Sequence, residues 1–287
     1  MQTARLLWEM GKPRIMLLLC CMTLCGALLA PSPSLFRSLA AAAVVGLLWL
    51  GTALINDLAD LAIDQASNPN RPLPSGRLRP GIALAWGIGA QTTALLLTVA
   101  LGSRSAIALT LCGLFLGNVY SVPPFRLRRN GPAANLIIGA GVGCAVLGGQ
   151  LAHGRITSGG LVAGLVLGLG AAAVSLVKDF KDVAGDRAQG VRTLPVRLGW
   201  GPAVRINLYA TAAAYGLLLF ATVHQVGLLH PLTLLVGCLA ITALLLLRGL
   251  LRSVSPGRAR TVHQQAMLLF MGVSLCYALA QWLARCR

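Results

Sequence analysis

The sequence predicts an all-α membrane protein: a polytopic transmembrane bundle of about nine helices that forms a single integral membrane domain over residues 1–287. Composition is the first reason. Hydrophobic residues make up 56% of the chain and charged residues only 11%, and the mean hydropathy of +0.77 is far above that of water-soluble domains. Periodicity is the second, because apolar segments long enough to cross a ~30 Å hydrocarbon core recur along the whole chain.

The expected spans follow one another with short connections between them. Their approximate bounds are 14–30, 36–56, 82–101, 104–120, 133–151, 160–178, 203–222, 231–251 and 264–283. Glycines that recur in the fifth and sixth spans are expected to let helix backbones approach closely.

Lysine and arginine divide unequally between the two sides of these spans. The N-terminal segment and the loops after spans two, four, six and eight hold 19 of the 24 basic residues, and the opposite side holds five. Because cytoplasmic loops carry the excess of positive charge, we expect a cytoplasmic N-terminus. A bacterial inner or plasma membrane is the expected location. The net charge of +17 is then explained by topology and contact with membrane lipids, and nucleic acid is not an expected partner.

Six of the seven acidic residues fall into two triplets of identical spacing, next to apolar segments where carboxylates are costly to bury. In a helix the offsets 0, +3 and +7 bring three carboxylates onto one face. The triplets are Asp57, Asp60 and Asp64, and Asp179, Asp182 and Asp186.

The segments around the two triplets also match each other. Arg71-Pro-Leu-Pro follows the first triplet and Arg192-Thr-Leu-Pro follows the second, at an offset of 121 residues against 122 for the aspartates. Such a pseudo-repeat predicts two acidic faces that point into one central cavity on the cytoplasmic side.

Clustered carboxylates beside basic residues predict a Mg²⁺ site that binds a phosphorylated ligand. Mg²⁺ prefers oxygen ligands and commonly bridges carboxylates to phosphate oxygens. All six aspartates are therefore expected to be metal ligands and catalytic residues. A cavity with a charged end and apolar walls suits an isoprenyl diphosphate.

The motifs resemble those of the UbiA superfamily of intramembrane prenyltransferases. The resemblance is carried by N-D-x-x-D-x-x-x-D with N-R-P-L-P-S-G after it, at Asn56–Gly76, and by K-D-x-x-D-x-x-G-D-R at Lys178–Arg187. The segment Tyr120–Gly131 is similar to the chlorophyll and bacteriochlorophyll synthase branch. The R-T-L-P sequence at Arg192–Pro195 also resembles quinone and glyceryl-lipid prenyltransferases.

The resemblance implies Mg²⁺-dependent transfer of a prenyl group from an isoprenyl diphosphate to an aromatic or lipophilic acceptor, with two Mg²⁺ ions expected at the two motifs. Several residues beside the motifs are expected to bind substrate: Asn56, Arg71, Tyr120, Arg126, Lys178, Lys181 and Arg192. Three alternatives stay open at this point. They are esterification of a tetrapyrrole carboxylate, a terpene cyclase that needs no acceptor, and a cation-coupled transporter.

Overall fold

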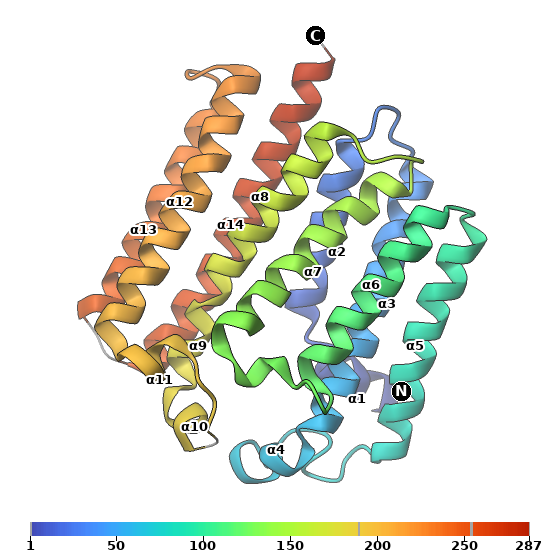
Figure 1. The fold of residues 1–287 in the computed structure, drawn as a ribbon, viewed down its shortest axis with the longest axis vertical. Helices are drawn as coiled ribbons and strands as arrows, with labels where there is room; N and C mark the ends of the chain where they lie inside the picture. The colour runs from blue at the N-terminus through green and yellow to red at the C-terminus, as the bar shows by residue number, and fades with distance from the viewer. Residues whose placement is uncertain (1, 189, 253–254, 287) are drawn as a thin grey trace.

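The computed structural model describes residues 2–188, 190–252 and 255–286. The regular structure of this part of the chain is helical, apart from one isolated bridge between Asn130 and Arg192 (Figure 1). The helices are α1 (Gln2–Met10), α2 (Pro13–Leu28), α3 (Leu35–Ala59), α4 (Leu61–Ser67), α5 (Pro80–Ala100), α6 (Arg104–Ser121), η1 (Leu127–Arg129), α7 (Gly131–Leu151), α8 (Ser158–Ser175), α9 (Val177–Lys181), α10 (Val183–Ala188), α11 (Leu194–Leu198), α12 (Trp200–Val226), α13 (Pro231–Arg252) and α14 (Pro256–Arg285).

A helix occupies each of the nine expected spans, but fewer of these helices are long and apolar enough to cross a membrane. Seven meet that description within the described residues, and the bent pair formed by α1 and α2 would make an eighth. The helix α6 falls short because Arg104 lies at its start and the polar Asn118 and Ser121 lie near its end. The integral membrane character is confirmed, whereas the count of nine spans stays a prediction.

Local sequence explains where the long helices begin. Proline lies at the first or second position of α2, α5, α7 and α14, where its missing N–H removes no helical hydrogen bond. Side-chain caps start three helices. The hydroxyls of Ser103, Thr157 and Ser255 accept hydrogen bonds from backbone N–H groups in the first turns of α6, α8 and α14.

Glycine allows the central helices to pack closely, as expected from the sequence. A Cβ atom at Gly139 of α7 would lie 2.5 Å from the backbone oxygen of Gly168 in α8, and one at Gly143 would lie 3.0 Å from that of Gly164. Side chains larger than hydrogen would force these helices apart. Small-residue contacts of this kind are typical of helices that associate in lipid, where apolar burial gives little driving force.

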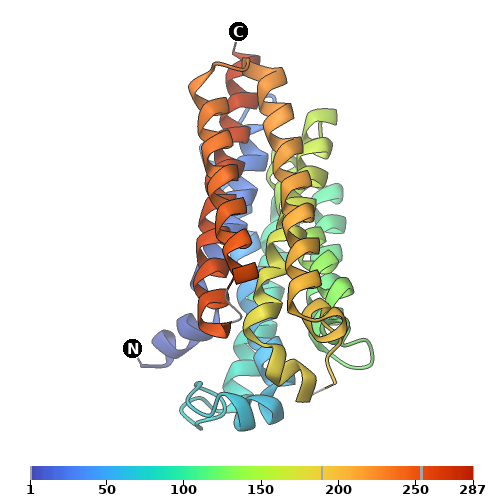
Figure 2. The ribbon, with the colours of Figure 1, turned by 90° about the vertical axis from the view of Figure 1, so that its left-hand side faces the viewer.

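The core lies between α2, α7, α8, α12, α13 and α14 and includes the fully buried aromatic residues Tyr215, Phe270 and Tyr277. Many large apolar side chains instead point outward along the long helices, among them Phe115 and Phe220. This pattern is expected when lipid surrounds the bundle. The short helix α1 leaves the bundle at 65° to α2 and projects sideways from one end (Figure 2).

Candidate active site

Both acidic motifs lie where a long helix breaks, at the end of the bundle that carries α4, α10 and α11 (Figure 1). The helix α3 ends at Ala59, and α4 begins after Asp60, whose backbone angles are φ −101° and ψ 0°. In the second motif α9 ends before Asp182, at φ −111° and ψ 7°. The middle aspartate of each triplet therefore has the same non-helical conformation, which supports the repeat. The expectation of three carboxylates on one continuous helix face was wrong, because each helix is interrupted inside its triplet.

The three carboxylates of the first triplet are buried, and each is matched by a basic side chain. Lys12 Nζ lies 2.8 Å from Asp57 Oδ1, and Arg71 Nη1 lies 2.8 Å from Asp64 Oδ2. Arg128, from η1, forms an ion pair with Asp60. The triplet is thus contacted from the connection before α2, the loop after α4 and η1, so that three separate chain segments converge on it.

The second triplet is more open. Asp179 is buried and accepts hydrogen bonds from Asn135 Nδ2 at 3.1 Å and from Lys178 Nζ at 3.2 Å. The side chain of Asp182 is 51% exposed and pairs with Lys181 at 2.9 Å. Asp186 accepts a hydrogen bond from Thr193 at 3.3 Å. Two of these three carboxylates therefore remain accessible to an incoming ion.

The residues of both triplets suit a divalent cation. Burial raises the pKa of the Asp60 carboxyl to about 6, with Asp57 and Asp64 acting in the same direction against Arg128. Burial likewise raises the pKa of Asp186 to about 6, helped by Asp182 and Asp179. Asp60 Oδ1 is also buried without a hydrogen-bond partner. Hard oxygen donors that repel one another are the donor set that Mg²⁺ prefers.

No group of three acidic, histidine or cysteine side chains among the described residues already has the geometry of a metal site. The carboxylates are instead engaged by lysine and arginine side chains. Binding of an ion would therefore require those ion pairs to rearrange, so the aspartates remain predicted rather than demonstrated ligands.

A cavity of about 640 Å³ runs from the motif end of the bundle toward the opposite end. Its lining residues on α3 extend from Arg37 to Asn56 at helical spacing, a distance of about 28 Å at 1.5 Å per residue. On α6 they extend from Ser103 to Ser121 in the same way. The motif end is polar, and its side chains include Lys12, Asn56, Tyr120, Ser121 and Lys178.

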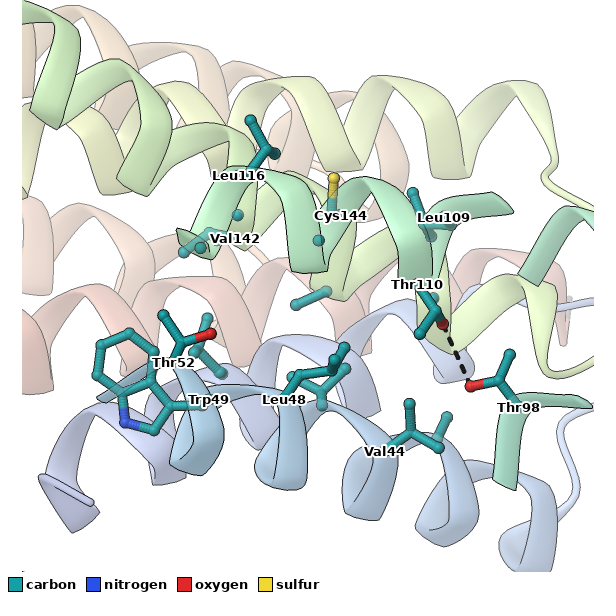
Figure 3. Close-up of a pocket in the computed structure, with 18 of the residues that line it drawn as sticks. Val44, Leu48, Trp49, Thr52, Thr98, Leu109, Thr110, Leu116, Val142 and Cys144 are labelled. Carbon is teal, nitrogen blue, oxygen red and sulfur yellow. Dashed lines mark hydrogen bonds between the residues drawn. The ribbon is translucent and has the colours of Figure 1, made fainter. Parts of the chain in front are cut away.

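Most of the remaining wall is apolar (Figure 3). Val44 and Leu48 from α3 face Leu109 and Leu116 from α6, and Val142 from α7 completes this part of the wall. Thr98 and Thr110 are polar but bond to each other at 3.2 Å. The cavity therefore offers a charged end and a long, water-poor tube.

The expected substrate-binding residues are distributed over three places. Asn56, Tyr120 and Lys178 line the polar end of the cavity. Arg71 and Lys181 are held against aspartates of the motifs. Arg126 and Arg192 do not line the cavity and instead line a separate hollow at the surface. None of the six aspartates lines the cavity, so the expectation that the carboxylates point into it is not confirmed. The motif residues that line the cavity are Asn56 and Lys178.

Sequence reasoning did not identify four residues that contribute to this site. Lys12 reaches both Asn56 and Asp57 from a left-handed backbone conformation at φ 49°. Trp49 lines the cavity and donates from its indole N–H to Gly11 O at 2.7 Å. The other two are Asn135, which bonds to Asp179, and Arg128, which pairs with Asp60. For Asn135 a useful signal was its position inside an apolar span, because burying an asparagine there costs free energy unless its side chain has a hydrogen-bond partner.

A membrane-embedded helical bundle with a long apolar cavity, whose polar end includes one residue from each of two repeated acidic motifs, defines a class of enzyme that acts on lipidic substrates within the bilayer. Comparison with known proteins identifies the class more closely. Residues 18–271 match the UbiA prenyltransferase family, and the chain belongs to that family. It is a prenyltransferase.

The curated relatives include members of two groups. A digeranylgeranylglyceryl phosphate synthase of Halobacterium salinarum is 33% identical over 214 residues, which cover 72% of this chain and 74% of the relative. A chloroplastic chlorophyll synthase of Arabidopsis thaliana is 35% identical over 155 residues, which cover 52% of this chain and 40% of that protein.

Solved structures confirm the fold. A structure described as giving structural and mechanistic insights into digeranylgeranylglyceryl phosphate synthase in membranes superposes with a TM-score of 0.74 at 21% identity, covering 98% of this chain and 99% of the other. A UbiA homologue from Archaeoglobus fulgidus bound to DMAPP and Mg²⁺ superposes with a TM-score of 0.70 at 17% identity, covering 95% and 99%.

Proposed function

We propose that the protein transfers a prenyl group from an isoprenyl diphosphate to a lipophilic acceptor, in a Mg²⁺-dependent reaction at the polar end of the cavity. The observation that carries this proposal is the joint lining of one cavity by Asn56 and Lys178, one from each acidic motif, above a long apolar wall. The homologue bound to DMAPP and Mg²⁺ is consistent with such a donor.

Asp57, Asp60 and Asp64 would hold one Mg²⁺ ion and Asp179, Asp182 and Asp186 a second. When bound, Mg²⁺ neutralises the diphosphate oxygens and stabilises the charge that develops as the allylic C–O bond breaks. Lys12 and Lys178 add positive charge at the same end of the cavity, and Arg71 and Lys181 are close enough to the motifs to join the diphosphate site.

The aromatic rings at the polar end have a separate role in the proposal. Trp49 and Tyr120 line the cavity, and a ring face stabilises a nearby positive charge. A carbocation-like allylic centre formed beside these rings would be shielded from water by the apolar wall. The electron-rich acceptor would then attack that centre.

Esterification of a tetrapyrrole carboxylate is a second candidate. It is favoured by the similarity to chlorophyll synthase, which is confined to about half of this chain. A UbiA-type terpene cyclase would use the same motifs without an acceptor. The transporter hypothesis loses its support, because the carboxylates lie at helix ends and the chain belongs to a family of enzymes.

The proposal is tested by turnover in membranes that contain the wild type, Asp60→Ala or Glu9→Gln. Radiolabelled geranyl, farnesyl, geranylgeranyl and phytyl diphosphates are supplied with phenolic, tetrapyrrole and glyceryl-lipid acceptors. We expect acceptor-dependent transfer that EDTA abolishes and Mg²⁺ restores. Asp60→Ala should lower turnover by about a hundredfold or more, in the range measured for the loss of a group that stabilises transition-state charge.

Glu9→Gln is the matched control, because Glu9 is the one acidic residue outside the motifs and its only described partner is Arg77 at 3.8 Å. Its activity should equal that of the wild type. Diphosphate release without an acceptor would instead identify a cyclase. An Asp60→Ala protein with wild-type activity would contradict the assignment of the motif.

A further inference from the structure

The helix α12 carries three polar side chains that are buried in the bundle and have no part in the proposed reaction. Asn207, Thr211 and Tyr215 follow one another at intervals of four residues, so they lie on one face of the helix. Each is at most 1% exposed. Asn207 Nδ2 donates to Ala173 O of α8 at 2.6 Å, and the Tyr215 ring stacks on Phe270 of α14. The face is therefore turned to the interior of the protein and not to lipid.

One polar atom of each side chain has no hydrogen-bond partner among the described residues. The atoms are Asn207 Oδ1, Thr211 Oγ1 and Tyr215 OH. Their depth makes this costly, because Asn207 and Tyr215 lie about 10 Å and about 22 Å from the start of a helix long enough to span the membrane. Bulk water does not reach that depth, and a buried polar group without a partner costs free energy. We therefore expect a bound partner for all three atoms.

The Thr211 hydroxyl differs from other hydroxyls in the long helices. A threonine or serine inside a helix commonly donates to the carbonyl oxygen four residues earlier. Bonds of this kind, 2.7–2.9 Å long, occur at Thr23, Thr98, Thr222 and Ser274. For Thr211 the corresponding carbonyl belongs to Asn207, but the hydroxyl forms no bond with it. The hydroxyl thus remains able to bind a molecule between the helices.

The spacing of the three residues matches one water molecule between each neighbouring pair. Positions four residues apart in a helix are separated by about 6 Å along its axis. Two hydrogen bonds of about 2.8 Å that share one water oxygen span about 5.6 Å, which is close to that separation. Side chains in a helix also lean toward its N-terminus, which directs the Tyr215 hydroxyl toward the turn of Thr211.

The chemistry of the three atoms also favours water over other occupants. Asn207 Oδ1 can only accept a hydrogen bond, whereas the hydroxyls of Thr211 and Tyr215 can donate or accept. The occupant must therefore be able to donate and to accept. An apolar molecule cannot do so, and the three side chains carry no charge that would hold an ion. Buried waters typically bind in this way to polar groups that lack another partner.

We infer that α12 holds two ordered water molecules, one between Asn207 and Thr211 and one between Thr211 and Tyr215. This water site lies beside the second acidic motif, because Ala173, the acceptor for Asn207, lies in the last turn of α8. The waters fix the Asn207 side chain, and Asn207 fixes the end of α8, from which α9 with Lys178 and Asp179 follows. The site needs no substrate, so the inference is independent of the proposed function.

Radiolytic footprinting tests the inference on wild-type protein in phosphatidylcholine nanodiscs. X-rays split a bound water into a hydroxyl radical, which oxidises the nearest side chain, and mass spectrometry locates the product. Tyr215 should be oxidised despite its burial. Tyr277 is the matched control, because it is equally buried in the same core and its hydroxyl accepts from Gln281 Nε2 at 3.2 Å. It should stay unmodified. A Tyr215 side chain as unreactive as Tyr277 would overturn the inference.

A substitution at the middle position tests whether the three groups act together. Thr211→Val removes the hydroxyl and keeps the shape of the side chain, so oxidation of Tyr215 should be lost. Thr211→Ser keeps the hydroxyl and should retain the oxidation. Unchanged oxidation of Tyr215 in Thr211→Val would show that water reaches this residue by another route, which would overturn the inference.

Thermal denaturation of Tyr215→Phe gives an independent measurement. If the hydroxyl binds water, its removal leaves that water with fewer partners, and the melting temperature should fall below that of the wild type. If the hydroxyl has no partner, its removal relieves the cost of burying it. A melting temperature equal to or above that of the wild type would therefore overturn the inference.

Discussion

Asn135 shows how a single polar residue in an apolar helix can organise the second acidic motif. Its amide nitrogen donates to Asp179, while its oxygen accepts from Ser175 at 2.5 Å and from Lys178 at 2.9 Å. The Asn135 side chain is almost fully buried, so its amide group cannot bond to water instead. Asn135 is thus a positioning residue that holds Lys178 and Asp179 in fixed relation.

We expect Asn135→Ala to raise the Mg²⁺ concentration needed for half-maximal turnover by about tenfold to a hundredfold, because residues that orient metal ligands contribute on that scale. The variant should also lose roughly 1–3 kcal/mol of unfolding free energy, since buried Asp179 would lose a hydrogen-bond donor and Ser175 and Lys178 would each lose one of two acceptors. Titration of turnover with Mg²⁺ and thermal denaturation in detergent measure the two effects.

Asn118→Ala is the comparison for this prediction. Asn118 is also an asparagine within a span expected from the sequence, but it bonds to Leu114 O in its own helix and to Gln91 Oε1 at 3.5 Å, and it lies outside both motifs. Its Mg²⁺ requirement should stay that of the wild type. Unchanged Mg²⁺ dependence in Asn135→Ala would show that Asp179 does not need this support.

At the scale of elements, the sequence predicts helix positions well and helix interruptions poorly. Each predicted span contains a helix because apolar length is a strong signal. The interruptions at Asp60 and Asp182 were missed because a 0, +3, +7 spacing fits a continuous helix equally well. Tertiary contacts determine whether the helix is interrupted, and one of them joins Asp60 to Arg128, 68 residues further along the chain.

The candidate site was predictable to the same extent. Asn56 and Lys178 were chosen from local motifs and do line the cavity. The location of Arg192 depends on a bridge to Asn130, 62 positions earlier, which no local pattern indicates. Lys12 was missed as a site residue for a similar reason, because its contact with Asp57 depends on the angle between α1 and α2.

The helix α7 contributes one wall of the cavity, and Gly141 lies on that wall, so that a larger side chain at this position would extend into the cavity. A Cβ atom there would meet no atom within 4 Å, and the residue lies ten positions from Gly131, or about 15 Å from the motif end. Gly141→Leu should therefore block the tube at mid-depth. We expect kcat/KM for geranylgeranyl and phytyl donors to fall about tenfold or more relative to geranyl diphosphate.

Gly216→Leu on α12 is the matched control, because that glycine is exposed and a Cβ atom there would likewise meet no atom within 4 Å. Its donor preference should not change. An equal loss for all donors in Gly141→Leu would mean that the prenyl chain does not occupy this cavity.

At the scale of the whole molecule, charge and architecture agree on one orientation. The motif helices α4, α10 and α11 lie at one end of the bundle, and the last turns of α14 lie at the other (Figure 1). The predicted cytoplasmic side, with 19 of the 24 basic residues, includes the loops that carry both motifs. We propose on this basis that the active site opens to the cytoplasm.

Two positions, the native Cys286 and a cysteine introduced at Asn70, test that orientation with a membrane-impermeant maleimide applied to spheroplasts. Cys286 is exposed at the end of α14, and Asn70 is exposed in the loop that follows the first triplet. We expect the reagent to label the wild type at Cys286 and to leave Cys286→Ser unlabelled, since Cys112 lies within a span expected from the sequence and Cys238 within a helix long and apolar enough to cross the membrane. The double variant Asn70→Cys, Cys286→Ser should be labelled only after permeabilisation. Labelling of Asn70→Cys in sealed spheroplasts would show that the orientation is opposite to the predicted one. The donor would then have to be supplied from outside the cell.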